Sequence, residues 1–243
     1  MIQRRLMPGW IEIDAPKLAT VRRTPLRATF IERPHRFAAR CTLRGGREAV
    51  AHVPNPGRLT GVLAPRCQVL LDGPYPPTRS LAYTMVAAKA GGVWVGTNTL
   101  YANRVFPTLV SHGLFPEFDG SSIRAEVAHG HSRFDFRLGG VMAEIKSVTL
   151  AGGGAGRFPD AVSARAARHC SELAALARSG DPTAIIFVAQ RGDVASLSPE
   201  DDVDPGFGVA LRSAAEAGVM VLACALEIAP EGAIRARRVA VDL

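Results

Sequence analysis

The sequence predicts an α/β (α+β) protein of two units, a small β-rich barrel followed by a mixed sheet with helices. About six short strand candidates with frequent turns lie before residue 98. After it, helix, three strands, helix, strand, helix and strand follow in order. Charge divides the chain in a similar way, because residues 1–113 hold 16 Lys or Arg against 5 Asp or Glu, whereas residues 114–243 hold 13 against 17. A basic unit joined to an acidic one indicates that the first meets a polyanion.

The first unit is expected to be a closed barrel of short strands. Residues 1–24 have no clear periodicity and are interpreted as an N-terminal extension. Residues 25–98 follow, with strands expected at 27–31, 36–43, 48–53, 68–71, 81–88 and 93–97. A five-stranded OB-like barrel fits this size, and the usual ligands of such barrels include oligonucleotides. Few aromatic residues interleave with its arginines, so phosphate contact is favoured over base stacking, with Arg36, Arg40 and Arg58 as candidates.

The second unit, residues 99–243, alternates helices and strands. A helix is predicted over Thr99–His112, with Gly113 as its C-cap, and the next begins at a cap on Asp160 or Ser163 and ends near Ser179. The glycines between residues 152 and 156 form either a mobile lid or a plain connector. The other elements are strands at 123–128, 184–189 and 219–226, a helix at 205–217 and an edge strand at 234–241.

Residues 132–150, SRFDFRLGGVMAEIKSVTL, predict two strands joined by a Gly139-Gly140 turn. With that turn, apolar residues pair on one face of the hairpin: Leu138 with Val141, Phe136 with Ala143, and Phe134 with Ile145. The other face carries Arg133, Asp135, Arg137, Met142, Glu144 and Lys146.

On that second face Asp135 is expected directly opposite Glu144. Two carboxylates at this spacing repel each other by up to about 1 kcal/mol, which a divalent metal between them would relieve. Hard oxygen ligands suit Mg²⁺ or Mn²⁺, and Lys146 lies two residues along the same face. Asp…Glu-x-Lys on a hairpin is typical of the PD-(D/E)xK nuclease fold. We therefore interpret Asp135 and Glu144 as metal ligands and both, with Lys146, as catalytic-type residues; the alternative is a solvated hairpin face.

Several longer motifs occur in order along the chain. They are PNPGRLTG (54–61), NTxxAN (98–103), SRFDF (132–136), AEIKSVTL (143–150) and FPDAV (158–162). In these motifs the chain resembles the sugar fermentation stimulation protein family, from about residue 25 to the end. The resemblance implies an N-terminal OB-like domain, a nuclease-like second domain, non-specific DNA binding and a regulatory role in sugar (maltose) use.

The helix after FPDAV departs from the family pattern. Arg165 and His169 are kept, and with Arg168 they share one helix face that could hold a phosphate. Ala164 and Ala167 stand where the family usually has Glu and Gln, which weighs against efficient cleavage. The DNA-binding set predicted for the whole chain is Arg36, Arg40, Arg58, Arg133, Arg165, Arg168 and His169.

Two hypotheses follow: a DNA-binding protein whose nuclease-like site is not used for catalysis, or an active metal-dependent nuclease. RNA is a third possible ligand, and a homodimer is left open. No apolar run reaches the roughly 20 residues that a membrane span needs, so a cytoplasmic protein is expected. Cysteines 41, 67, 170 and 224 are too widely spaced for a zinc site and are expected to be reduced thiols.

Overall fold

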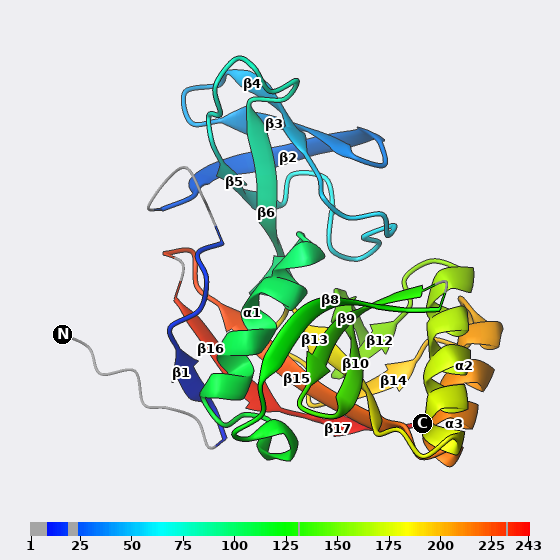
Figure 1. Cartoon of the computed structure of the whole chain (residues 1–243). Helices are drawn as coiled ribbons and strands as arrows, with labels where there is room; N and C mark the ends of the chain where they lie inside the picture. Colours follow the sequence, from blue (N-terminus) through cyan, green and yellow to red (C-terminus); the bar gives the residue numbers. More distant parts are fainter. Residues whose placement is uncertain (1–8, 19–23, 131, 232) are drawn as a thin grey trace.

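The computed structural model describes residues 9–18, 24–130, 132–231 and 233–243. Two units are stacked: a small barrel at the top of Figure 1, and below it a larger sheet with helices on both faces. The barrel sheet contains β2 (Leu26–His35), β3 (Ala38–Leu43), β4 (Glu48–His52), β5 (Gln68–Asp72), β6 (Tyr83–Ala90) and β7 (Val93–Gly96).

The barrel is closed by five of these strands. β2 pairs with both β3 and β5, β3 pairs with β4, and β6 pairs with β5. The ring closes through a short parallel pairing of β4 with β6. This connectivity is that of an OB-type barrel, and the fold predicted for the first unit is confirmed. A separate apolar core that includes Phe30, Val69 and Met85 fills its interior.

The second unit is built on a seven-stranded sheet in the order β1-β16-β15-β13-β10-β9-β8. The central strands β10, β13 and β15 are parallel, and their neighbours on both sides are antiparallel. The predicted mixed sheet is thus confirmed. Its strands are β1 (Ile11–Ile13), β8 (Ile123–His129), β9 (Ser132–Leu138), β10 (Val141–Val148), β13 (Thr183–Ala189), β15 (Met220–Ile228) and β16 (Ile234–Arg238).

Helices cover the two faces of this sheet and make a core on each. One core forms under α1 (Leu100–Ser111) and a short 3-10 turn, η1 (Pro116–Phe118). The other forms under α2 (Ala164–Arg178) and α3 (Pro205–Glu216). In Figure 1 α1 begins just below the barrel and runs down in front of the sheet, while α2 and α3 stand together at the right. Among the described residues no helix is long and apolar enough to cross a membrane.

The glycine-rich segment expected as a lid or connector is instead part of a second small sheet. β11 (Leu150–Gly152) and β12 (Ala155–Phe158) form a hairpin whose turn is Gly153-Gly154, both with positive φ. β12 then pairs with β14 (Ser196–Pro199), and β14 with β17 (Ala240–Val241). These long-range pairings hold the segment in place.

The N-terminal extension is also more ordered than expected. Ile11–Ile13 form β1, which pairs antiparallel with β16, so β16 is not the edge strand that the sequence predicted. The side chains of Trp10, Ile13 and Leu18 are buried. Residues 1–8 and 19–23 of the predicted extension lie outside the described residues.

The β9–β10 hairpin has the predicted register from Leu138–Val141 to Phe136–Ala143, and there its ladder stops. Phe136 belongs to the core under α1, with its ring 5.3 Å from that of Phe106. Phe134, expected on the same face, packs in the other core instead, 5.6 Å from the ring of His169. The hairpin therefore contributes to both cores, and its two faces do not divide simply into apolar and polar. All four cysteines are free thiols, as predicted.

Candidate functional site

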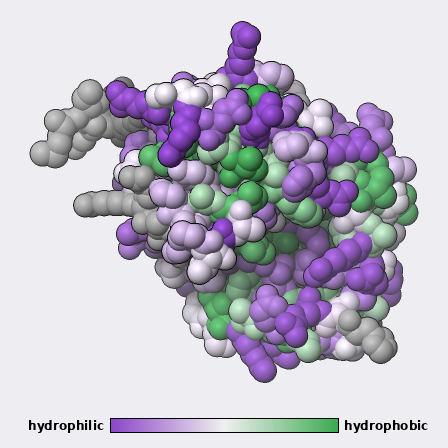
Figure 2. All heavy atoms as spheres, turned by 90° about the horizontal axis from the view of Figure 1, so that it is seen from above, coloured by the Kyte–Doolittle hydropathy of each residue, from purple (hydrophilic) through white to green (hydrophobic). Residues whose placement is uncertain are grey.

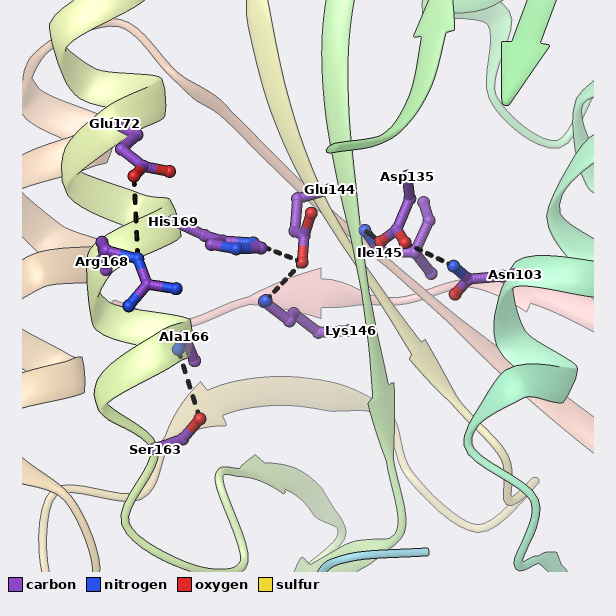
Figure 3. Close-up of polar contacts among 10 residues, drawn as sticks. All are labelled: Asn103, Asp135, Glu144, Ile145, Lys146, Ser163, Ala166, Arg168, His169 and Glu172. Carbon is purple, nitrogen blue, oxygen red and sulfur yellow. Dashed lines mark hydrogen bonds and ion pairs between the residues drawn. The ribbon is translucent and has the colours of Figure 1, made fainter. Parts of the chain in front are cut away.

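The candidate site lies where β10 passes between α1 and α2. Glu144 and Lys146 have the same parity on β10, so both side chains point toward α2 (Figure 3). Ser163 is the N-cap of α2, and its hydroxyl accepts a hydrogen bond from the Ala166 amide at 3.2 Å. This cap sets the start of the helix, and His169 then faces β10.

Glu144 is buried and tied to two basic groups. Its Oε1 lies 2.8 Å from the Lys146 ammonium and 2.7 Å from His169 Nδ1. Both partners are buried as well. Burial would raise the pKa of Glu144, but the hydrogen bond from His169 and the charge of Lys146 outweigh it, so the pKa is lowered. Glu144 therefore stays ionised, while its other oxygen, Oε2, has no hydrogen-bond partner among the described residues.

Asp135 approaches β10 from its other side, toward α1 (Figure 3). Its Oδ2 accepts the Ile145 amide at 2.8 Å, and its Oδ1 accepts the side-chain amide of Asn103 at 2.6 Å. The side chain bonds the β10 backbone at the point where the β9–β10 ladder ends, which accounts for the missing pairs. Asp135 is therefore fixed beside the strand that carries Glu144.

The pKa of Asp135 is raised to about 6. Burial is the main cause, and the negative charge of Glu144 adds to it. The hydrogen bonds from Ile145 and Asn103 and the charge of Lys146 oppose the rise without cancelling it. The predicted repulsion between the two carboxylates is thus present in the electrostatics of the site.

The donor set fits a hard divalent cation in part. The unpartnered Oε2 of Glu144 and the carboxylate of Asp135 are anionic oxygen ligands of the kind that Mg²⁺, Mn²⁺ and Ca²⁺ bind. No cluster of three or more His, Cys, Asp or Glu side chains suited to a metal occurs in the described part of the chain. A cation held here would have these two carboxylates and would complete its shell with backbone carbonyls or water.

The predicted DNA-binding arginines differ in how far their charge is already neutralised. Arg40 is 45% exposed but lies between Glu32 and Glu48, at 3.2 and 3.7 Å. Arg133 and Arg168 also have carboxylate neighbours, Glu126 at 3.4 Å and Glu172 at 3.7 Å. Those that are exposed without an ion pair to any described residue are Arg36, Arg58 and Arg165.

His169 does not lie on the surface with Arg165 and Arg168. The two arginines are exposed, whereas His169 is buried against Glu144 and Phe134. Residues 165, 168 and 169 are close on a helical wheel, but the spacing does not say which of them faces the sheet. The structure therefore gives His169 a contact within the site in place of the predicted contact with DNA.

Sequence reasoning missed several residues that build the site or join the two units. Asn103 holds Asp135, and buried Gln190 donates to the Ser147 hydroxyl of β10 at 2.7 Å and to the Asn98 carbonyl at 2.8 Å. Asp160 accepts the Leu59 amide of the barrel loop at 3.3 Å. The sequence motifs already pointed to most of these positions, because the motifs quoted above include Leu59, Asn98, Asn103 and Asp160.

Comparison with known proteins identifies both units. Residues 31–97 match the model of the "SfsA N-terminal OB domain", and residues 100–232 match that of the "Sugar fermentation stimulation protein RE domain". Relatives named sugar fermentation stimulation protein homolog include that of Symbiobacterium thermophilum, 38% identical over 86% of this chain and 91% of that protein. The homolog of Thioalkalivibrio sulfidiphilus is 39% identical over 90% of this chain and 95% of its own length.

A solved structure is also similar along almost the whole chain. It is titled "The structure of Pyrococcus Furiosus SfsA in complex with Ca2+", with a TM-score of 0.84 and 27% sequence identity. The match covers 94% of this chain and 100% of that one. Because both domains match this family's models, and because the relatives and the solved structure agree along most of the chain, the chain belongs to the sugar fermentation stimulation protein family.

Proposed function

We propose that this chain binds DNA through its phosphates, without sequence preference, and holds a divalent cation at the β9–β10 hairpin. The observation that carries the proposal is the pair of carboxylates, half-buried Asp135 and buried Glu144, set on either side of β10 with Lys146 beside Glu144. The Pyrococcus furiosus relative, whose title names bound Ca²⁺, supports a cation site in this fold. The basic charge of residues 1–113 supports a polyanionic ligand.

Each residue of the proposed site has a different role. Lys146 and His169 keep Glu144 ionised and fix its Oε1, which leaves Oε2 available to a ligand. Asn103 and the Ile145 amide orient Asp135. A bound Mg²⁺ or Mn²⁺ would neutralise charge on a phosphate and lower the pKa of a bound water.

Hydrolysis of a phosphodiester bond is the second candidate function. Lys146 favours it, because an ammonium beside the carboxylates can stabilise the extra negative charge that forms on a phosphate during attack. Ala164 and Ala167, at the start of α2, weigh against it, because methyl groups cannot hold a water or a metal. Binding without cleavage is therefore the primary proposal.

DNA binding is tested by measuring affinity for a random-sequence duplex from low to high salt. We expect log K to fall linearly with log salt concentration, because neutralised phosphates release counterions. Arg58→Ala should reduce the slope by about 1, since Arg58 is exposed without an ion pair to a described residue. The matched variant Arg40→Ala should change it less, because two glutamates already neutralise Arg40. Absent or salt-insensitive binding would refute the proposal.

Cleavage is tested separately with labelled single- and double-stranded DNA, with Mg²⁺ or Mn²⁺ and with a chelator. Metal-dependent cleavage that is lost in both Glu144→Gln and Lys146→Ala would establish the enzyme. Intact binding with no cleavage under any metal would leave the binding function alone. RNA in place of DNA, a homodimer, a cytoplasmic location and a role in sugar (maltose) use stay predictions.

A further inference from the structure

A cavity of about 230 Å³ lies between the barrel and the second unit, next to the candidate site. The barrel contributes Arg36 and Asn55, and the second unit contributes Thr149, Phe158 and Asp160. Ser147, which directly follows Lys146 on β10, also lines it. Seen from above the barrel, the surface of the molecule mixes hydrophilic side chains with apolar patches (Figure 2).

The two walls of the cavity are fixed to each other. Asp160 accepts the Leu59 amide, and Gly57 approaches so closely that a Cβ there would lie 2.1 Å from Asp160 Oδ2. Arg33 holds the barrel loop from behind by donating to the carbonyls of Asn55, Gly57 and Arg58. The cavity is therefore preformed, and a ligand would not have to order its walls.

Two buried side chains that line the cavity have polar groups without a protein partner. Asn55 is 3% exposed, and its Oδ1 accepts the Gly57 amide. Its NH₂ group donates to no residue that the structure describes. Thr149 is 5% exposed, and its hydroxyl likewise has no described partner. Neither donor is among the fully buried polar atoms that lack a partner, so both open into the cavity, where a ligand or ordered water can accept a hydrogen bond from them.

The remaining lining suits a flat heterocycle better than a bare phosphate. Phe158 is held edge-on by Phe187 and Phe207, at 5.6 and 5.0 Å between ring centroids, and gives a rigid aromatic wall. Val162 at the rim is 72% exposed, an apolar surface with no described cover. Donors from Asn55 and Thr149, an acceptor from Asp160 and apolar walls together match the edge and faces of a nucleobase.

We propose that this cavity holds one unstacked base of a DNA strand whose backbone crosses the hairpin site. The inference rests on the proposed DNA-binding function and makes it narrower: the favoured ligand is single-stranded or locally unpaired DNA. The base enters between Asn55, Thr149 and Phe158, and the adjoining phosphate lies toward the hairpin site. Arg36, at the barrel side of the opening, contacts the backbone of the same strand.

The test compares two labelled duplexes by fluorescence anisotropy. One carries a single unpaired nucleotide, and the other carries an abasic residue with the same backbone at that position. We expect wild-type protein to bind the first about tenfold more tightly, because loss of the base removes stacking and hydrogen bonds. Thr149→Val, which keeps the shape of the side chain, should cut that ratio about fivefold, as should Asn55→Asp, which keeps the bond to the Gly57 amide.

Thr84→Val is the matched control. Thr84 is a buried threonine on β6 outside the cavity, and its hydroxyl has no hydrogen-bond partner among the described residues. The ratio of the two duplex affinities measured with Thr84→Val should therefore equal that of the wild type. Thermal unfolding of each variant shows whether it is folded. Equal wild-type affinity for the two duplexes, or variants with an unchanged ratio, would overturn the base pocket and leave DNA binding intact. Failure of the wild type to bind either duplex would overturn both proposals.

Discussion

The contact between Gly57 and Asp160 leads to a sharp prediction about how the two units are joined. In Gly57→Ala the new methyl group would lie 2.1 to 2.5 Å from the three atoms of the Asp160 carboxylate. The carboxylate can turn away only by giving up its hydrogen bond to the Leu59 amide. The cost is then at least that bond, about 1 kcal/mol, and up to about 3 kcal/mol if the loops must move apart.

The assay is thermal or urea unfolding of a double-mutant cycle. For a chain of this size 1 kcal/mol shifts Tm by about 2–4 °C, so Gly57→Ala should lower Tm by about 2–12 °C. The same substitution in an Asp160→Ala background should cost much less, because the clashing carboxylate is gone. Gly140→Ala serves as the control, since its nearest neighbouring atom would be 3.8 Å from the new methyl group. Equal costs of Gly57→Ala in both backgrounds would refute the reasoning.

Three further predictions concern the site and its supports. In metal-free protein Asp135 keeps its proton between pH 3.8 and about 6 while the unfolded chain has lost it, so stability should fall by about 3 kcal/mol as pH rises through this window. Asp135→Asn should flatten the fall in urea titrations. Calcium at 100 times its Kd should stabilise the wild type by about 2.7 kcal/mol and Glu144→Gln far less, as measured by calorimetry. Arg33→Ala removes bonds to four main-chain carbonyls and should cost about 2 kcal/mol in urea unfolding, against under about 0.5 for the exposed Arg58→Ala.

The main elements of both units could be predicted because their signals are local. The barrel strands alternate and are separated by Gly and Pro turns, and α2 has a Ser163 cap and a glycine beyond its end. The Gly139-Gly140 turn set the hairpin register as far as Phe136 and Ala143. The expected cross-strand pair of Asp135 with Glu144 does not form, because Asp135 bonds the Ile145 amide instead, although the charge of Glu144 still acts on it.

Features that depend on distant partners could not be predicted. β1 has three residues and exists only by pairing with β16, more than 200 residues along the chain. β11 and β12 were hidden by their glycines, because the strand that holds them, β14, has a weak pattern of its own. Strand parity also could not show that the hairpin contributes to two cores, so Phe134 was expected on the same face as Phe136, whereas it packs in the other core.

The face of α2 that packs against the sheet could have been predicted from the sequence. Ala166, His169, Cys170 and Leu173 follow the i, i+3, i+4, i+7 spacing of a buried helix face, and all four are buried. If His169 had been grouped with these buried residues and not with its arginine neighbours, its side chain would have been predicted to face β10. The unpartnered hydrogen-bond donors of the cavity could not have been predicted from the sequence, because their positions depend on how the two units pack together.

The pairing of β1 with β16 bears on how the chain could be shortened for study. β16 would otherwise offer a row of open amide and carbonyl groups, and such an exposed strand edge recruits other chains. Removing residues 1–24 would uncover it together with the apolar surface now under Trp10, Ile13 and Leu18. A trimmed protein should therefore self-associate, and any new oligomer seen with it would reflect the missing strand and not the native assembly.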